Sequence, residues 1–267
     1  MTTPPNQSPL LKQLSYLWRF LATGFAFLLF GCGGILISLA ISLFFYLTPI
    51  DKGRKSFTAR RVISLAFRIY INTLQALGLL TYEIRGKHNI PTSGCLVVAN
   101  HPSLLDVVFL ISQIKQTDCV VKGSLRRNWL TKSPVTAANY VCNDSTGLIN
   151  DCVAAINTNK PLILFPEGTR TTPGAELNFQ RGAANIALMA GCSLLPVSIQ
   201  CHPATLLKSE RWYHIASTPP HYTIEFLSPL NPADMVASDL PQSKAARVLT
   251  RHLEQYFTKK LSNRPCP

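Results

Sequence analysis

Charged residues are scarce in this chain, and acidic ones are the scarcer kind. Of the 267 residues, 15% are Asp, Glu, Lys or Arg, well below the roughly 25% of ordinary soluble domains. Hydrophobic residues make up 47%, whereas a disordered chain combines low hydrophobicity with high charge. The mean hydropathy of +0.16 is too low for a polytopic membrane protein. The composition therefore indicates a folded domain with one strongly apolar segment.

The cysteines lack any pairing or metal-binding pattern. There are eight, with no C-x-x-C and no Cys/His zinc spacing. Five of them stand in or beside short apolar runs, where a thiol behaves as a small hydrophobic group. We therefore predict free thiols in a reducing compartment and no metal site.

Basic charge is concentrated at the N-terminal end. The formal net charge is +13, and residues 1–87 carry 10 basic and 2 acidic side chains, a net +8. Such an excess usually binds nucleic acid or anionic lipid. The sequence has no nucleic-acid-binding motif, and the basic residues flank an apolar run. We therefore predict membrane lipid, and not nucleic acid, as the partner of this region.

That apolar run extends from Phe20 to Ile50, 31 residues without a charge. As a helix it would be roughly 46 Å long, longer than the ~30 Å hydrocarbon core. A tilted helix could span the membrane from about Leu21 to Leu47. Alternatively, the glycines within 31–34 could break it into a re-entrant or monotopic element. A secretory signal is disfavoured because its apolar part is shorter and ends at a small-residue cleavage site.

The flanks of the run predict its orientation. Two basic residues precede it and six follow it. By the positive-inside rule, the C-terminal side then lies in the cytoplasm. We therefore expect the chain at the inner (cytoplasmic) membrane, with the domain that follows on the cytoplasmic side.

A second helix is predicted from Phe57 to Leu80. Its polar residues recur at steps of three and four and form one narrow stripe: Arg61, Ser64, Arg68, Asn72 and Gln75. Such a helix could lie in the membrane interface, with arginines such as Arg60, Arg61 and Arg68 directed toward lipid phosphates. It could equally pack on the following domain.

From residue 81 onward, short apolar runs alternate with helical stretches. The expected strands are 81–86, 95–99, 119–121, 139–142, 162–165, 193–199 and 222–227. The expected helices are 104–114, 148–158, 182–190 and 243–261. This alternation predicts an α/β layered sandwich with a central mixed, largely parallel sheet. In such sheets, functional residues gather at the carboxyl ends of the strands.

The first candidate site follows the strand at 95–99, in the segment Asn-His-Pro-Ser-Leu-Leu-Asp. His101 would precede a helix and Asp106 would lie in its first turn, so the two side chains could meet. A carboxylate on one imidazole nitrogen leaves the other nitrogen free to act as a base. The alternative is a capping histidine, with the aspartate bonded to nearby backbone.

The second candidate site is Phe-Pro-Glu-Gly-Thr-Arg, which follows the strand at 162–165. Arg170 could grip a phosphate with two parallel hydrogen bonds. Glu167 could orient that arginine or bond a substrate hydroxyl, and Gly168 would let the backbone approach a ligand. The alternative is an ion pair between Glu167 and Arg170 within a turn.

Taken together, the two motifs resemble the glycerolipid acyltransferase family, whose best-known members make phosphatidic acid from 1-acylglycerol-3-phosphate. His101 and Glu167 stand 66 residues apart. Two further blocks match in order, Phe-Gln-Arg-Gly-Ala-Ala at 179–184 and Leu-Leu-Pro-Val at 194–197. The segment at 121–126 departs from the family pattern except at Lys122, and Thr171 stands where serine is frequent. These departures leave the acceptor open.

The resemblance implies a role for each matching residue. His101 would be the general base and Asp106 would orient it. The other positions would bind substrate: Lys122, Glu167, Gly168, Thr169, Arg170 and Pro196. It implies a donor that is acyl-CoA or acyl carrier protein, a lysophospholipid acceptor and no cofactor. The chain then divides into a polar tail (1–19), a transmembrane or monotopic segment (20–50), a basic amphipathic interfacial helix (51–80) and an acyltransferase domain (81–267).

Two alternatives remain at this point. The same chemistry could act on a different lipid acceptor of a specialised bacterial pathway. The chain could instead be a non-catalytic lipid-binding membrane protein, in which His101 would be dispensable.

Overall fold

The centre of the protein is a seven-stranded sheet. The computed structural model describes residues 9–48, 50–171, 175–208, 210–211 and 213–262. The strand order is β1-β7-β6-β2-β5-β3-β4. The strands are β1 (Thr81–Arg85), β2 (Leu96–Ala99), β3 (Asp118–Val121), β4 (Val141–Cys142), β5 (Leu162–Leu164), β6 (Leu194–His202) and β7 (His221–Phe226). Every neighbouring pair is parallel except β6 and β7. The predicted fold class, α/β with a mixed and largely parallel sheet, is confirmed.

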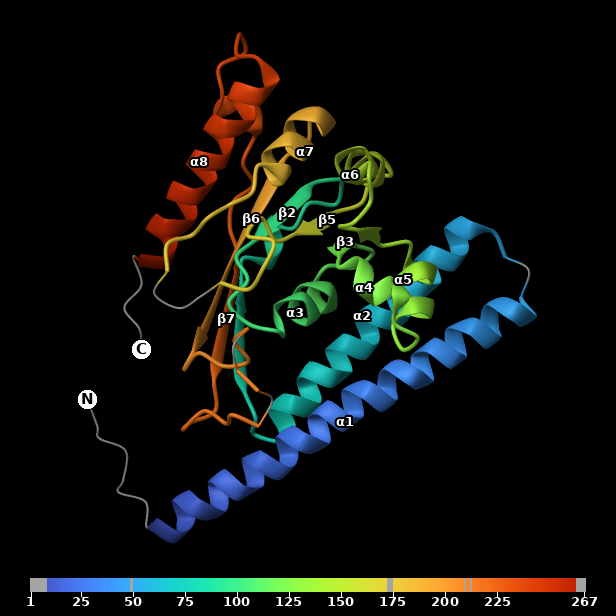
Figure 1. Ribbon diagram of the computed structural model, residues 1–267, viewed down its shortest axis with the longest axis vertical. Helices are drawn as coiled ribbons and strands as arrows, with labels where there is room; N and C mark the ends of the chain where they lie inside the picture. Colours follow the sequence, from blue (N-terminus) through green and yellow to red (C-terminus); the bar gives the residue numbers. More distant parts are fainter. Residues whose placement is uncertain (1–8, 49, 172–174, 209, 212, 263–267) are drawn as a thin grey trace.

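Helices cover both faces of this sheet (Figure 1). They are α1 (Pro9–Leu47), α2 (Lys52–Ala76), α3 (Asp106–Gln113), α4 (Gly123–Arg127), α5 (Lys132–Ala138), α6 (Leu148–Asn157), α7 (Gly182–Ala190) and α8 (Gln242–Ser262). Short 3-10 turns occupy Lys87–Asn89 and Pro232–Asp234. The sequence did not predict α4 and α5, whose short segments show no helical apolar period.

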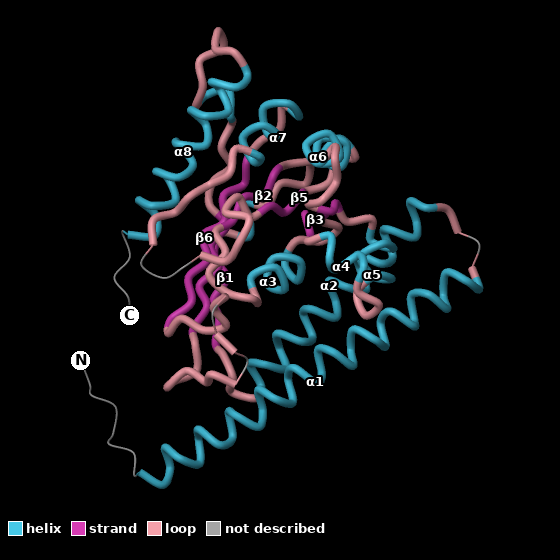
Figure 2. The backbone as a smooth tube through the Cα atoms, in the orientation of Figure 1, coloured by secondary structure: helices cyan, strands magenta, loops and turns pink. Residues whose placement is uncertain are grey.

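The strands alternate their side chains between two cores, as a pleated strand must. On β2, Val97 and Ala99 belong to the core formed with α2 and α3. Leu96 and Val98 belong to the core formed with α6, α7 and α8. Figure 2 shows the two helical layers on either side of the sheet, with α1 running outside α2.

α1 is one continuous helix, and among the described residues it is the one helix long and apolar enough to cross a membrane. The glycines at 31–34 do not interrupt it. It begins at Pro9, so residues 9–19, which were expected in the N-terminal tail, are helical; a proline suits a first helical position and the leucines that follow favour a helix. Residues 1–8 lie outside the described part.

α1 packs lengthwise against the rest of the protein. Near its start, Trp18 donates to the Leu77 carbonyl at 3.0 Å, and the Arg19 guanidinium donates to the carbonyls of Ala216 and Ser217. Near its end, the Ser42 hydroxyl lies 2.8 Å from that of Ser133 on α5. The helix is therefore attached to the domain at both ends.

α2 packs on α3 and α5, and this packing corrects the expectation for Arg60. Its side chain is 3% exposed and forms an ion pair with Asp118. Its Nε donates to the Ala138 carbonyl at 2.9 Å. Arg60 therefore does not reach a lipid surface, whereas Arg61 and Arg68 are exposed.

Candidate active site

Asn100 directly follows β2 and lies at the carboxyl edge of the sheet. Its Oδ1 accepts from the Ile199 amide and its Nδ2 donates to the Ile199 carbonyl, both at 2.8 Å. The amide thus takes the place of one more backbone pairing between β2 and β6. His101 follows directly and lies at the edge where functional residues gather in such sheets.

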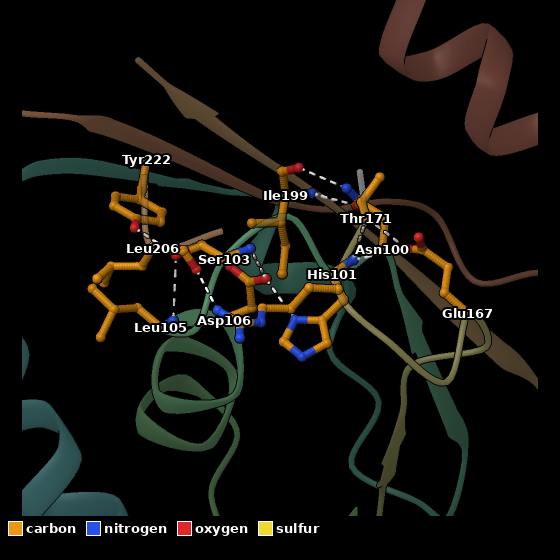
Figure 3. A network of polar contacts seen from close by, with 11 residues as sticks. Asn100, His101, Ser103, Leu105, Asp106, Glu167, Thr171, Ile199, Leu206 and Tyr222 are labelled. Carbon is orange, nitrogen blue, oxygen red and sulfur yellow. Dashed lines mark hydrogen bonds and ion pairs between the residues drawn. The ribbon is translucent and has the colours of Figure 1, made fainter. Parts of the chain in front are cut away.

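His101 and Asp106 form the predicted pair. The imidazole Nδ1 lies 2.8 Å from Asp106 Oδ2, and this oxygen also accepts from the Ser103 amide at 2.7 Å (Figure 3). The aspartate is fully buried, whereas the histidine side chain is 20% exposed. Among the described residues, nothing hydrogen-bonds the imidazole Nε2. The geometry therefore leaves a partly exposed nitrogen opposite the one that Asp106 holds.

The surroundings of the pair affect the ionisation of Asp106 and the orientation of the imidazole. Burial raises the pKa of Asp106 to about 6, and the hydrogen bond from His101 opposes that rise. The other oxygen, Oδ1, is buried without a hydrogen-bond partner among the described residues. The ring of Phe165 stacks on the imidazole with 4.2 Å between ring centres, which fixes its plane.

The second motif and Thr171 form hydrogen bonds with the backbone of His101. Glu167 Oε1 accepts from the His101 amide at 3.0 Å and from the Thr171 hydroxyl at 2.8 Å. The Thr171 amide donates to the His101 carbonyl at 2.7 Å. Burial raises the pKa of Glu167, and its bonds to Thr171 and His101 work against that rise. Glu167 thus joins the two motifs into one site.

Arg170 does not pair with Glu167, contrary to the alternative considered from the sequence. Its Nη1 donates to the carbonyl of Leu206 at 2.5 Å, and within the described residues the two side chains of the motif form no ion pair. The half-buried arginine is therefore positioned by the segment after β6, while its remaining N–H groups have no protein partner in the described part of the chain.

Gly168 and Thr169 form the exposed outer turn of the motif. Gly168 has φ +67°, a left-handed conformation that glycine adopts without the strain of a side chain. Any other residue would strain the loop that connects Glu167 to Arg170. This is a structural reason for glycine in addition to the expected approach to a ligand.

Lys122 and Pro196 are placed differently from the rest. Lys122 is exposed and follows β3, at the same carboxyl edge as His101 but two strands away. Pro196 is buried within β6, in register with Val98, and so lies in the sheet below the edge. The structure therefore joins His101, Asp106 and Glu167 by hydrogen bonds. It places Arg170 next to Thr171, which bonds His101, and leaves Lys122 and Pro196 at the periphery.

Four supporting residues were not identified from the sequence. Asn100 and Ser103 lie within the first motif, and Thr171 directly follows the second, so their positions were a signal. No sequence signal pointed to Tyr222. Its hydroxyl lies 2.8 Å from the Ser103 hydroxyl, although the two residues are 119 positions apart in the chain.

An apolar chamber of about 600 Å³ begins beside the dyad. Leu104 and Leu105 line it directly before Asp106, and Leu206 lines it beside Arg170. Its other walls come from α1, α2, α3, the α4–α5 segment and the residues that lead into β7. Polar and titratable groups therefore meet an apolar space at this one edge. Among the described residues no cluster of three or more His, Cys, Asp or Glu could hold a metal.

The chain is similar to several proteins of known name. Mouse 1-acyl-sn-glycerol-3-phosphate acyltransferase alpha is 25% identical over 169 residues, 60% of this chain and 58% of that protein. Human glycerol-3-phosphate acyltransferase 4 is 28% identical over 168 residues, 58% of this chain and 34% of that protein. The 1-acyl-sn-glycerol-3-phosphate acyltransferase of Pseudomonas aeruginosa is 25% identical over 171 residues, 59% of this chain and 63% of that protein. The chain thus spans less than two thirds of each of these relatives.

A solved structure shares the fold. It is the crystal structure of the 1-acyl-sn-glycerophosphate acyltransferase PlsC from Thermotoga maritima, with a TM-score of 0.65 and 20% identity. The superposition covers 96% of this chain and 100% of that chain. Residues 81–200 match the family described as Acyltransferase, a range that contains both motifs. Residues 81–200 of this chain are therefore a domain of the acyltransferase family, as the motifs predicted.

Proposed function

We propose that this protein is a membrane-associated O-acyltransferase that moves an acyl chain from a thioester to the hydroxyl of a lysophospholipid. The preferred acceptor is 1-acyl-sn-glycerol 3-phosphate, which gives phosphatidic acid. The observation that carries the proposal is the His101–Asp106 pair, 2.8 Å apart beside an apolar chamber. The names of the relatives support the acyl transfer and the phosphate-bearing acceptor.

His101 acts as the general base. With Asp106 ionised, the imidazole keeps its proton on Nδ1 and offers Nε2 to the acceptor hydroxyl. The hydroxyl proton passes to Nε2 while the oxygen attacks the thioester carbonyl. The tetrahedral intermediate then expels the thiolate, which takes that proton from the imidazolium. A thioester is already activated, so the step needs no acyl-enzyme; general base catalysis contributes about 10²–10⁴-fold.

The second motif binds the acceptor's phosphate and glycerol. Arg170 uses one nitrogen to hold Leu206 and offers the others to an anion in a bidentate bond. Gly168 and Thr169 present an exposed turn beside it, and Lys122 adds positive charge at the same edge. Glu167 holds the His101 backbone, so it sets the distance between phosphate site and base. Pro196 supports the donor side from within the sheet.

The membrane places both lipid substrates within reach. α1 carries many exposed large hydrophobic side chains, which supports membrane association. Its contacts from Trp18 to Ser42 favour a helix lying along the domain in the membrane surface, as in a monotopic protein. We assign the catalytic domain to the cytoplasmic side of the inner membrane, where acyl thioesters are made.

The location has its own test. High salt should leave the protein on membranes, since apolar burial is not screened as surface charge is. A reporter fused to the C-terminus should be active only when it is a cytoplasmic reporter. Activity of a periplasmic reporter there would contradict the assigned side.

The function is tested by crossing donors with acceptors. Acyl-CoA and acyl carrier protein would each be combined with 1-acylglycerol 3-phosphate, glycerol 3-phosphate and a lysolipid lacking an exposed phosphate monoester, with products read by mass spectrometry. We expect phosphatidic acid with at least one donor and none from the variant His101→Ala. Preference for the third acceptor would support a specialised lipid pathway. No product from any pair would favour the non-catalytic alternative.

A further inference from the structure

Most of the exposed large apolar side chains outside the first two helices lie close to one another. Among the described residues, four large hydrophobic side chains beyond α2 are exposed: Leu104 at 45%, Leu125 at 38%, Trp129 at 73% and Met189 at 46%. Leu104 and Leu125 line the apolar chamber, and Trp129 stands in the turn between the lining residues Leu125 and Leu130. Three of the four therefore lie at the rim of the chamber.

The segment that carries Trp129 is also basic. Residues 119–143 contain four basic residues and no acidic one. Arg127 pairs with Asp144 at 2.6 Å, whereas Arg126 and Lys132 are exposed and have no ion pair within the described part of the chain. An exposed tryptophan between arginine and lysine is typical of a segment that sits at a membrane interface.

This segment lies beside the proposed membrane helix α1. Ser133 on α5 contacts Ser42 on α1, and both elements line the chamber. Figure 1 shows α5 beside α1. The neighbouring turns of α1 present Leu36, Leu39 and Leu43, each about 60% exposed or more. One apolar and basic surface therefore runs from α1 to Trp129.

From these observations we propose that the α4–α5 turn is a second membrane anchor in addition to α1, with Trp129 in the headgroup region of an anionic bilayer. The basic side chains Arg126 and Lys132 contact lipid phosphates. Leu104 and Leu125 then lie against the membrane, so that lipid passes from the bilayer into the chamber along this rim and reaches His101 three residues from Leu104. This role in delivery rests on the proposed function, while the anchoring itself does not.

Tryptophan fluorescence tests the anchor directly. The chain has three tryptophans, so Trp18→Phe with Trp212→Phe leaves Trp129 as the sole tryptophan, which is excited selectively at wavelengths that tyrosine does not absorb. The full chain would be reconstituted in vesicles of equal parts phosphatidylcholine and phosphatidylglycerol, with nitroxide-labelled lipids present. We expect blue-shifted emission that is quenched more strongly by a label near the headgroup than by one near the chain end.

Met189 on α7 supplies a matched control, since it is an exposed apolar side chain on the other face of the sheet. Met189→Trp, in a chain whose three native tryptophans are replaced by Phe, should escape quenching by either label. Equal quenching at the two positions, or none at Trp129, would overturn the proposal. The second result would leave a protein partner or a closed chamber as the explanation of this surface.

The delivery role is tested by kinetics. Trp129→Ser should raise the KM for an acceptor embedded in vesicles about three- to tenfold, because the loss of one interfacial aromatic weakens membrane contact. The KM for the same acceptor dispersed in detergent should not change. Equal changes in both assays would overturn the delivery role. Because quenching needs no turnover, it distinguishes failure of the anchor from failure of the proposed function.

Discussion

Arg60 on α2 and Asp118 on β3 form an ion pair in which each side chain is 3% exposed. The same guanidinium donates to the carbonyl of Ala138, the last residue of α5. One side chain thus joins α2 to both the sheet and α5, and fixes the wall of the chamber that these helices form.

Breaking this pair should destabilise the protein strongly. Arg60→Ala leaves a buried carboxylate without a partner, and we expect a loss of about 3–5 kcal/mol in the free energy of unfolding. Chemical denaturation in detergent micelles would measure it. Arg61→Ala, at the exposed neighbouring position, is the control and should change stability by less than about 0.5 kcal/mol. Similar losses in the two variants would contradict a structural role for the pair.

Replacement of the base tests the proposed chemistry. His101→Ala should lower the rate of acyl transfer by about 10²-fold or more, the usual contribution of a general base. Circular dichroism and membrane binding should not change, because the imidazole is partly exposed and the backbone bonds to Glu167 and Thr171 do not need it. A variant that kept more than about a tenth of the rate would be inconsistent with this role.

Replacement of Asp106 by Asn should lower activity but stabilise the protein relative to wild type as the pH rises. Burial raises its pKa in the folded protein to about 6, above the 3.8 of an aspartate in water. Its stabilising contribution is therefore complete below pH 3.8 and is lost as the pH rises through 6. Asp106→Asn should gain stability relative to wild type as the pH rises, by at most about 3 kcal/mol. Thermal melts at pH 5 and pH 8 would measure this, and a constant difference would contradict the buried carboxylate.

The same ionisation controls turnover. The carboxylate holds the Nδ1 proton of His101, so wild-type activity should fall as the pH drops through about 6. Asp106→Asn should be slower than wild type at every pH, by up to about 10⁴-fold, because an amide does not select the required tautomer.

Arg170 should affect one substrate more than the other. Arg170→Lys removes the forked donor, so the ammonium group would have to choose between the Leu206 carbonyl and the acceptor's phosphate. We expect a higher KM for the acceptor and little change in that for the donor. Steady-state kinetics with each substrate varied in turn would decide, and a change in the donor KM alone would mean that the substrates are assigned to the wrong motifs.

Local patterns in the sequence were enough to predict the strands and the largely parallel sheet. Short apolar runs predicted the strands because a buried strand needs only four to eight apolar residues, and the alternation with helices predicted a largely parallel sheet. The spacing of His101 and Asp106 predicted their contact, because a loop residue and the first turn of the following helix are close in any such fold. The start of α1 was missed because a helix boundary depends weakly on composition.

The tertiary structure decided which polar groups are partners. From the sequence, Glu167 could have paired with Arg170 in its own motif, yet it bonds the backbone of His101, because β2 and β5 are adjacent in the sheet and their carboxyl ends meet. Arg60 was expected to be directed toward lipid phosphates, yet it is buried against Asp118 because α2 packs at the start of β3. The sequence by itself determined the strands, the longer helices and the chemistry available at each strand end. Only folding determined these partners, since they are far apart along the chain and no local pattern encodes their distance.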